Sequence, residues 1–199
     1  MFPLLESLKL KDGQIQHPEY HQARMNVSMR ELFPLTELIK LNDVISIPEH
    51  CRSGLFKIRI TYGTSVEQID IEPYSFRIIQ SLKIVHHETI DYHLKSGNRQ
   101  ILQHLFAQRE NCDDIIIVKN GNITDSFAAN LLFFDGEEWF TPTTPLLKGT
   151  KRQVLLDRKI ISEKRIREED IPNYTKIGLI NAMIDFAEMP VIPIEKIVI

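Results

Sequence analysis

The sequence lacks the features of a membrane or secreted protein. None of its apolar runs is long enough to cross a membrane, and residues 1–6 lack the basic flank and long apolar core of a secretion signal. Only two cysteines occur, Cys51 and Cys112, and no Cys-x-x-Cys pattern accompanies them, so neither a disulfide framework nor a cysteine-rich metal site is expected. We therefore expect a cytoplasmic protein with reduced thiols.

A surplus of charge of one sign is also missing. The 24 basic and 27 acidic residues of this 199-residue chain are interspersed and give a formal net charge of -3. Nucleic acids and membrane surfaces attract concentrated basic patches, so neither is an expected partner. The adjacent histidines His86 and His87 have no mixed Cys/His spacing around them, and we expect no metal site. Partners should be small molecules or a second copy of the chain.

Three common motifs are absent. The sequence contains no Gly-x-x-x-x-Gly-Lys-Ser/Thr loop, no Gly-x-Gly-x-x-Gly fingerprint and no Gly-x-Ser-x-Gly elbow. Kinase-like, dinucleotide-binding and serine-hydrolase functions therefore have no support in the sequence.

Hydrophobic patterning predicts an α+β protein in two parts, with domains at residues 1–80 and 81–199. The first part should contain a hairpin around Asp12-Gly13, helices at 18–32 and about 36–41, and antiparallel strands at 56–62 and 66–71. The second part should contain strands at 81–85, 115–118, 130–134 and 139–141, helices near 101–106 and 150–157, short elements at 166–171 and 177–180, and an edge strand at 190–194.

Lys95 and Asp125 each lie at a predicted junction between regular elements. A pyridoxal phosphate enzyme needs such a pair, because an amine must form a Schiff base with the cofactor aldehyde and a carboxylate must keep the pyridine nitrogen protonated. Ser96 is expected to cap a helix directly after Lys95, whose positive amino end would lower the pKa of the lysine. A phosphate-binding lysine, or two solvated surface charges, would also suit these positions.

Two further segments could bind an anion. Gly149 precedes a predicted helix, whose first backbone amides, those of Thr150 and Lys151, should point outward as in an anion site. Arg24 lies in the first predicted helix, where it could offer a bidentate fork to phosphate. Solvated basic residues are the alternative in both places.

In order along the chain, these segments resemble the class IV aminotransferases, the pyridoxal phosphate enzymes of fold type IV. The resemblance rests on residues 6–13, 21–24, 95–99, 123–131, 149–152 and 180–183. It implies a two-domain fold like that of D-amino-acid aminotransferase, with the cofactor site between the domains and a homodimer as the assembly. The chain begins almost directly at the strand containing Glu6, so the resemblance implies an N-terminally shortened version of this fold.

The resemblance also implies a role for each matching residue. Lys95 corresponds to the Schiff-base lysine and general acid/base, and Asp125 to the carboxylate that pairs with the pyridine nitrogen. Asp125 departs from the family pattern, which usually has glutamate there. Arg24 corresponds to the arginine that binds the phosphate, and Leu147 to the aliphatic residue on the ring face. Thr150 and Lys151 correspond to the residues whose backbone amides bind the phosphate, and Asn181 and Ala182 to residues of a lining loop.

Within the family, residues 95–99, 128–130 and 181–183 look most like the lyase branch, which releases pyruvate from aminodeoxychorismate and leaves 4-aminobenzoate. Branched-chain or D-amino-acid aminotransferases use the same first steps and are the alternative, and a catalytically weak homologue that binds the cofactor is a second alternative. Either activity acts on an amino-acid-like substrate, whose carboxylates should attract a basic residue, with Arg59 and Arg99 as candidates.

Overall fold

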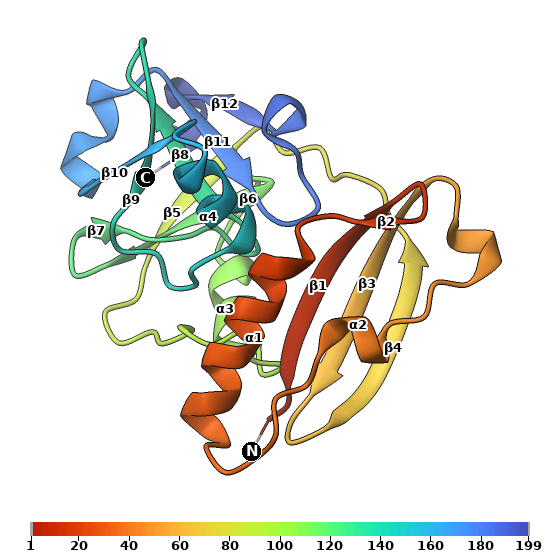
Figure 1. Cartoon of the computed structure of the whole chain (residues 1–199). Coiled ribbons are helices and arrows are strands. Elements are labelled where there is room, and N and C mark those ends of the chain that lie inside the picture. The colour runs from red at the N-terminus through yellow and green to blue at the C-terminus, as the bar shows by residue number, and fades with distance from the viewer. Residues whose placement is uncertain (1, 199) are drawn as a thin grey trace. The chain divides into compact units, whose positions relative to one another are not determined.

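The computed structural model describes residues 2–198 and contains two compact units, both drawn in Figure 1. Unit 1 extends to Phe76 and includes the segment Leu94–Asn98, and unit 2 consists of Arg77–His93 and the chain from Arg99 onward. The predicted division at residue 80 assigns Lys95 to the second part of the chain, whereas the structure assigns it to unit 1.

Backbone hydrogen bonds explain why residues 94–98 belong to unit 1. The Leu5 N–H donates to the Lys95 carbonyl at 2.8 Å, and the Gly97 N–H donates to the Pro3 carbonyl at 2.7 Å. These bonds join positions about ninety residues apart in sequence, so local composition carries no sign of them.

Unit 1 is an antiparallel four-stranded sheet in the order β2-β1-β3-β4, with helix α1 in contact with β1 (Figure 1). Asp12 and Gly13 occupy the left-handed region, with φ of 48° and 77°, as the predicted tight turn requires. The elements are β1 (Leu4–Lys11), β2 (Gln14–Ile15), α1 (Pro18–Leu32), α2 (Leu41–Val44), η1 (Glu49–Cys51), β3 (Leu55–Tyr62) and β4 (Val66–Pro73).

The core of unit 1 forms because β1 alternates its side chains between two faces. Leu4, Leu8 and Leu10 are buried on one face and pack with Met25 and Met29 of α1. Glu6 has the same parity as these leucines, so its carboxylate is also buried on this face.

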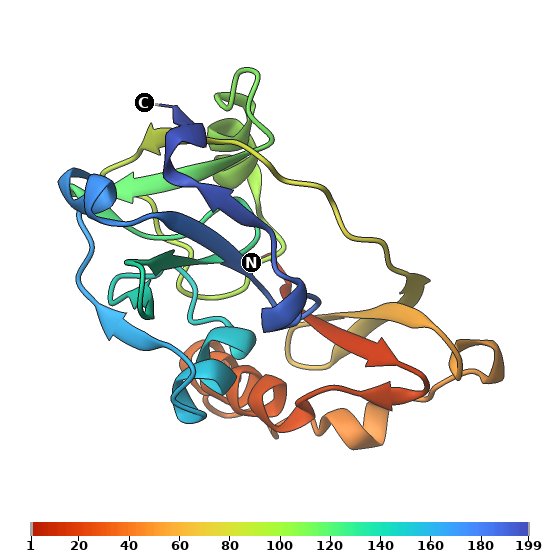
Figure 2. The ribbon, with the colours of Figure 1, turned by 90° about the horizontal axis from the view of Figure 1, so that it is seen from above.

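Unit 2 contains two sheets, in the orders β10-β9-β8-β11-β12 and β13-β5-β6-β7. In the second sheet β13 pairs in parallel with β5, and Figure 2 shows both strands near the C-terminus. The strands are β5 (Leu82–His86), β6 (Asp114–Lys119), β7 (Asn122–Ile123), β8 (Asn130–Phe134), β9 (Trp139–Pro142), β10 (Ser162–Lys164), β11 (Lys176–Ile180), β12 (Val191–Pro193) and β13 (Ile197–Val198). The helices are α3 (Gln100–Ala107), α4 (Thr150–Asp157), η2 (Glu168–Asn173), η3 (Phe186–Glu188) and η4 (Ile194–Lys196).

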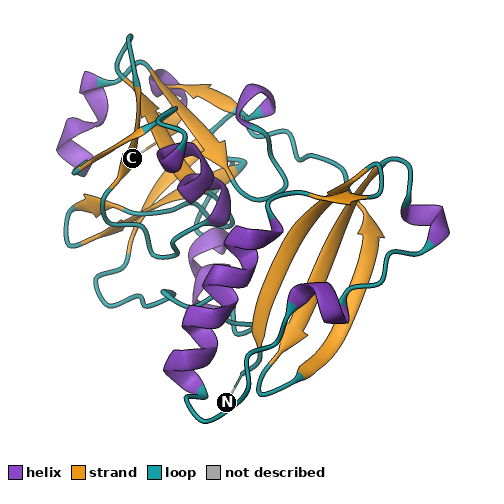
Figure 3. Cartoon of the chain, in the orientation of Figure 1, coloured by secondary structure: helices purple, strands orange, loops and turns teal. Residues whose placement is uncertain are grey.

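The mixture of helices and strands in Figure 3 confirms the predicted α+β class. Continuous apolar runs form the centre of unit 2, where Ile116 of β6 packs with Leu131 and Phe133 of β8 and with Ile177 of β11. No described helix meets the length and apolarity needed to cross a membrane.

Most predicted elements are present, but two local predictions are wrong. The short helix expected near 36–41 instead begins at Leu41, whose N–H donates to Gln22 Oε1 of α1 at 2.7 Å. Ser96 caps no helix, because its Oγ accepts from the Asn98 N–H at 3.1 Å and α3 begins only at Gln100. The argument that a helix end beside Lys95 lowers its pKa therefore fails.

Candidate active site

A buried charged cluster occupies the face of β1 that α1 covers. Glu6 Oε1 accepts from Arg24 Nε at 2.9 Å, and Glu6 Oε2 accepts from Arg24 Nη2 at 2.7 Å. His21 Nδ1 lies 2.7 Å from the same Oε2. His21 and Arg24 reach one carboxylate because residues three apart lie on the same side of a helix.

The electrostatics of this cluster keep Glu6 ionised. Burial alone would raise the pKa of Glu6, but the charge of Arg24 and the hydrogen bonds from His21 and Arg24 outweigh it and lower the pKa to about 2. Burial lowers the pKa of His21, and the charges of Arg24 and Lys95 lower it further, against the opposing effect of Glu6. His21 is therefore neutral near pH 7, with Nδ1 donating to the Glu6 carboxylate.

Lys95 belongs to the same region of unit 1. Its backbone is fixed at the start of β1 through the bond from Leu5, its side chain is half-buried, and its charge acts on His21. The charge of Lys95 thus acts on His21, the histidine that shares Glu6 with Arg24, and sequence reasoning did not assign Glu6 to the site. Arg24 donates two hydrogen bonds to Glu6, whereas the sequence predicted a fork offered to phosphate.

Asp125 forms the centre of a second group of polar residues, in unit 2. The side chain lies just after β7 and is only 6% exposed. Its Oδ2 accepts from the Leu147 N–H and its Oδ1 accepts from Asn130 Nδ2, both at 2.8 Å. Burial raises the pKa of Asp125 to about 7, and the hydrogen bonds from Leu147 and Asn130 offset that effect only in part.

Asn130 connects Asp125 to the start of α4. Its Nδ2 donates to the Asp125 carboxylate and also to the Leu147 carbonyl, the latter at 2.9 Å. A Cβ added to Gly149 would lie 2.0 Å from Asn130 Oδ1, so any larger residue would have to displace the Asn130 amide. One amide group therefore fixes the carboxylate and the turn that leads into α4.

Helix α4 begins where the sequence predicts an anion site. Helix α4 begins at Thr150 after Gly149, as the sequence predicts, and the first amides of a helix have no acceptor within the helix. Thr150 and Lys151 are both 5% exposed, which contradicts the alternative of solvated basic residues. The Lys151 ammonium lies 3.0 Å from Asp185 Oδ1, so its backbone rather than its charge remains the candidate for binding phosphate.

The loop after β11 adjoins the same group. Ile180 pairs with Asn130 in the β11–β8 ladder, and the next residue, Asn181, donates from Nδ2 to the Ala128 carbonyl at 3.2 Å. Ala182 follows it, half-buried. Unit 2 therefore places the candidates Asp125, Leu147, Thr150, Lys151, Asn181 and Ala182 around the segment 125–130 and the start of α4.

The two substrate candidates lie elsewhere. Arg59 of β3 pairs with Ser7, so it shares the sheet face opposite to Glu6 and is exposed. Arg99 donates from Nη2 to the Phe127 carbonyl at 2.7 Å, and its guanidinium lies 4.3 Å from the Phe127 ring centroid.

Sequence reasoning missed three residues of these groups: Glu6, His21 and Asn130. The spacing His21-x-x-Arg24 was a usable signal, because it places two donors on one helix face. Glu6 also carried a signal, since an acidic residue with the parity of buried leucines needs a partner.

The residues present fit pyridoxal phosphate. Asp125 is a buried carboxylate whose hydrogen-bond donors are all neutral, so a protonated ring nitrogen would stabilise its ionised form. The start of α4 supplies amides suited to a phosphate, and Lys95 supplies a primary amine. Such residues, in a mixed two-unit fold, define a pyridoxal-phosphate-dependent enzyme of fold type IV.

Comparison with known proteins gives the family. The model of the class IV aminotransferases matches residues 4–197, and the chain belongs to this family of pyridoxal-phosphate-dependent enzymes. It is 40% identical over 185 residues to an uncharacterized protein of Haemophilus influenzae, across 92% of this chain and 98% of the relative.

Solved structures show the same fold. A candidate 4-amino-4-deoxychorismate lyase from Haemophilus somnus has a TM-score of 0.87 and 36% identity, across 92% of this chain and 97% of that one. A hypothetical aminotransferase from Mycobacterium tuberculosis, solved with pyridoxal phosphate bound, has a TM-score of 0.78 and 17% identity, across 96% and 80%.

Proposed function

We propose that the protein is a lyase that converts 4-amino-4-deoxychorismate into 4-aminobenzoate and pyruvate. The observation that carries this proposal is the 36% identity, at a TM-score of 0.87, to the candidate lyase from Haemophilus somnus. The resemblance of residues 95–99, 128–130 and 181–183 to the lyase branch supports the same choice over an aminotransferase.

Lys95 and Asp125 serve one cofactor in this proposal. When bound, pyridoxal phosphate supplies an aldehyde that bonds to amines and a ring that accepts electrons. Lys95 would hold the cofactor through its amine until the substrate amine takes its place, and the freed Lys95 amine would then take the proton from the substrate carbon that bears the amino group and return a proton to the departing enolpyruvyl group. The Asp125 carboxylate would face the ring nitrogen and keep it protonated.

The other candidates bind and orient the cofactor. The amides of Thr150 and Lys151 bind the phosphate, and Leu147 packs on one ring face. Arg24 adds positive charge for the phosphate, while Glu6 fixes the direction of its guanidinium. Asn181 and Ala182 line the ring and the substrate.

Product analysis tests the reaction. The purified protein is incubated with aminodeoxychorismate, and separately with 2-oxoglutarate and a panel of L- and D-amino acids. We expect pyruvate and 4-aminobenzoate in the first assay and no amino-group transfer in the second. Amino-group transfer without pyruvate release would overturn the lyase proposal, and a yellow protein inactive in both assays would identify a weak homologue that binds the cofactor.

Substitution of Lys95 tests the site. Lys95→Ala should lower pyruvate release by at least about a hundredfold, because general acid/base catalysis is lost. Borohydride should fix the cofactor to the peptide containing Lys95 in the unmodified protein, and peptide mass analysis reports this without any activity assay. Lys11→Ala, at an exposed lysine of the same unit, is the matched control and should change neither result.

Assembly and location form a further part of the proposal. We propose a homodimer in the cytoplasm, in line with the resemblance to fold type IV enzymes. Light scattering that gives the mass of one chain would contradict the dimer.

A further inference from the structure

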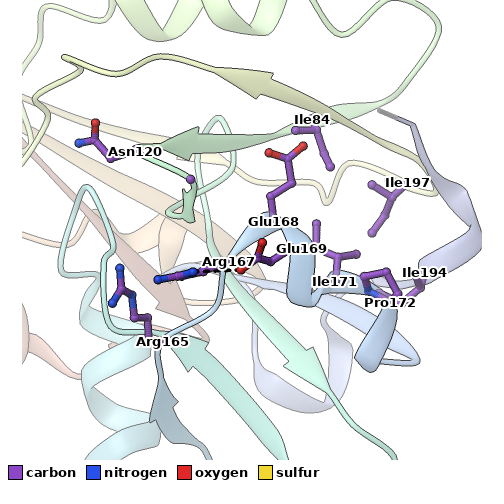
Figure 4. A pocket seen from close by; sticks show the side chains of 11 residues that line it. Ile84, Asn120, Arg165, Arg167, Glu168, Glu169, Ile171, Pro172, Ile194 and Ile197 are labelled. Atoms are coloured by element: carbon purple, nitrogen blue, oxygen red, sulfur yellow. Dashed lines mark hydrogen bonds and ion pairs between the residues drawn. The ribbon is translucent and has the colours of Figure 1, made fainter.

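Two groups of charged side chains differ in how far water reaches them. Arg167 and Glu169, which line a cavity in unit 2 (Figure 4), lie 3.0 Å apart, and their side chains are 50% and 72% exposed. Water competes for such a pair and screens it, so the pair fixes little. In the cluster of unit 1 the side chain of Glu6 is 1% exposed and that of Arg24 is 15% exposed. Each bond in that cluster therefore orients its partner.

Glu6 determines which way the Arg24 guanidinium faces. Its two carboxylate oxygens accept from Arg24 Nε at 2.9 Å and from Arg24 Nη2 at 2.7 Å, and these two donors form one edge of the planar group. The opposite corner, Nη1, therefore points away from Glu6. Because the charge of Glu6 offsets that of Arg24, the direction of the N–H groups decides what Arg24 offers to an anion. That direction is only as well fixed as the Glu6 carboxylate.

His21 fixes the Glu6 carboxylate. The last torsion of a glutamate side chain is broad, so its carboxylate needs more than one partner to hold a single orientation. His21 Nδ1 lies 2.7 Å from Glu6 Oε2, and the two side chains are 2% and 1% exposed, so neither can turn toward water. Because His21 is neutral near pH 7, it adds a hydrogen bond without a second positive charge that would compete with Arg24 for the carboxylate.

We propose that His21 is a positioning residue for the phosphate of the cofactor: it holds the Glu6 carboxylate, and Glu6 in turn aims the Arg24 guanidinium at the phosphate. This inference rests on the proposed role of Arg24 in binding pyridoxal phosphate and does not depend on the reaction that follows. The effect of His21 passes through two other side chains to the phosphate alone. Loss of His21 should therefore weaken the binding of compounds that carry a phosphate and spare those that lack one.

Binding of two compounds to cofactor-free protein tests the proposal: pyridoxal phosphate, and pyridoxal, which lacks the phosphate. Leucine and asparagine have almost the same shape, so His21→Leu and His21→Asn leave the same space and differ in the hydrogen bond to Glu6. We expect His21→Leu to weaken pyridoxal phosphate binding about tenfold, as for the loss of a hydrogen bond to a charged group, and to leave pyridoxal binding unchanged. His21→Asn should restore most of the affinity, because its amide can donate to Glu6.

Controls separate positioning from folding. Tyr62→Phe removes a buried hydroxyl that bonds to Ser28 in the same core and leaves the bonds to Glu6 intact, so it should change neither affinity. In the background of Arg24→Lys, which lacks the planar fork, His21→Leu should cause no further loss. Equal losses for the two compounds, equal losses in the two His21 variants, or additive losses with Arg24→Lys would overturn the proposal. A protein that binds neither compound would overturn the proposed function as well.

Proton NMR of the unmodified protein gives a test that does not depend on the folding of a variant. The Nδ1 proton of His21 is buried and bonded to a carboxylate, so it should give a resolved low-field signal. Pyridoxal phosphate should shift this signal more than pyridoxal does, because only the phosphate acts on Arg24. Equal shifts with the two compounds would count against a link between His21 and the phosphate and would overturn the proposal.

Discussion

The two units each bury a carboxylate, and the two acids behave in opposite ways. Glu6 in unit 1 is fully buried and its pKa is lowered to about 2, whereas Asp125 in unit 2 is 6% exposed and its pKa is raised to about 7. Burial acts in the same direction on both. The difference comes from the partners, because Glu6 faces the cation Arg24 and Asp125 receives its hydrogen bonds from neutral groups.

The difference in pKa indicates different roles for Glu6 and Asp125. Glu6 is ionised at every pH near neutrality, so it can orient Arg24 and His21 but takes up no proton in a reaction. Among the described residues no cation donates a hydrogen bond to Asp125, and a protonated pyridine nitrogen would be such a donor. Burial raises the pKa of Asp125, and a cationic group bound beside it would lower that pKa again.

The largest effect should come from removing the charge of Glu6. Glu6→Gln leaves Arg24 buried without its counter-charge, and loss of one partner of a buried ion pair costs about 3–5 kcal/mol. Urea unfolding at pH 7 measures this loss in free energy of unfolding. Glu72→Gln is the control, because Glu72 pairs with Lys57 at an exposed position of the same sheet and should change stability far less. Equal losses in the two variants would refute the role of burial.

Acid should remove the contribution of Glu6. Its folded pKa is depressed from 4.5 to about 2, so the stabilisation is present above pH 4.5 and disappears as the pH falls toward 2. The stability difference between the wild-type protein and Glu6→Gln should shrink by about 3 kcal/mol between pH 5 and pH 2. Other acids titrate in both proteins and cancel in this difference, and a difference that stays constant would contradict the ion pair.

Asp125 should show the opposite pH dependence. Its folded pKa of about 7 exceeds the usual 3.8, so the cost of ionising it is absent below pH 3.8 and complete above about pH 7. In cofactor-free protein, the wild type should lose about 2.5 kcal/mol relative to Asp125→Asn between pH 5 and pH 8. Thermal or urea unfolding at both pH values measures this change. A wild type that gains stability over the same interval would show that Asp125 has a cationic partner already.

Local patterns predicted the elements that depend on local physics. The hairpin at Asp12-Gly13, helix α1 after Pro18 and helix α4 after Gly149 all follow from turn chemistry and helix-start signals, and the structure confirms them. The prediction placed the short helix before Leu41, where the helix begins. A single helical turn gains its stability from tertiary contacts, here with Gln22 of α1, and these are not visible in the local sequence.

The candidate residues were predictable to a different degree. Resemblance to the family predicts cofactor roles for Lys95 and Asp125, and these stay predictions. The sequence does not show which face of a half-buried strand is covered. Arg59 was therefore chosen as a candidate, although the structure places it on the sheet face opposite to Glu6. The pairing of Lys95 with Leu5 is a long-range contact, and no local pattern encodes it.

The smallest effect tests how firmly Asp125 is held. Gly149→Ala places a Cβ 2.0 Å from Asn130 Oδ1, and the amide cannot move away without losing its bonds to Asp125 and Leu147. We expect a loss of about 1–2 kcal/mol, as for other overpacked sites. Gly63→Ala, which meets only the flexible Glu67 side chain at 3.3 Å, is the control. Asn130→Ala removes the clashing atom, so Gly149→Ala should cost much less in that background, and additive losses in the double mutant would show that Asn130 does not link the carboxylate to the helix start.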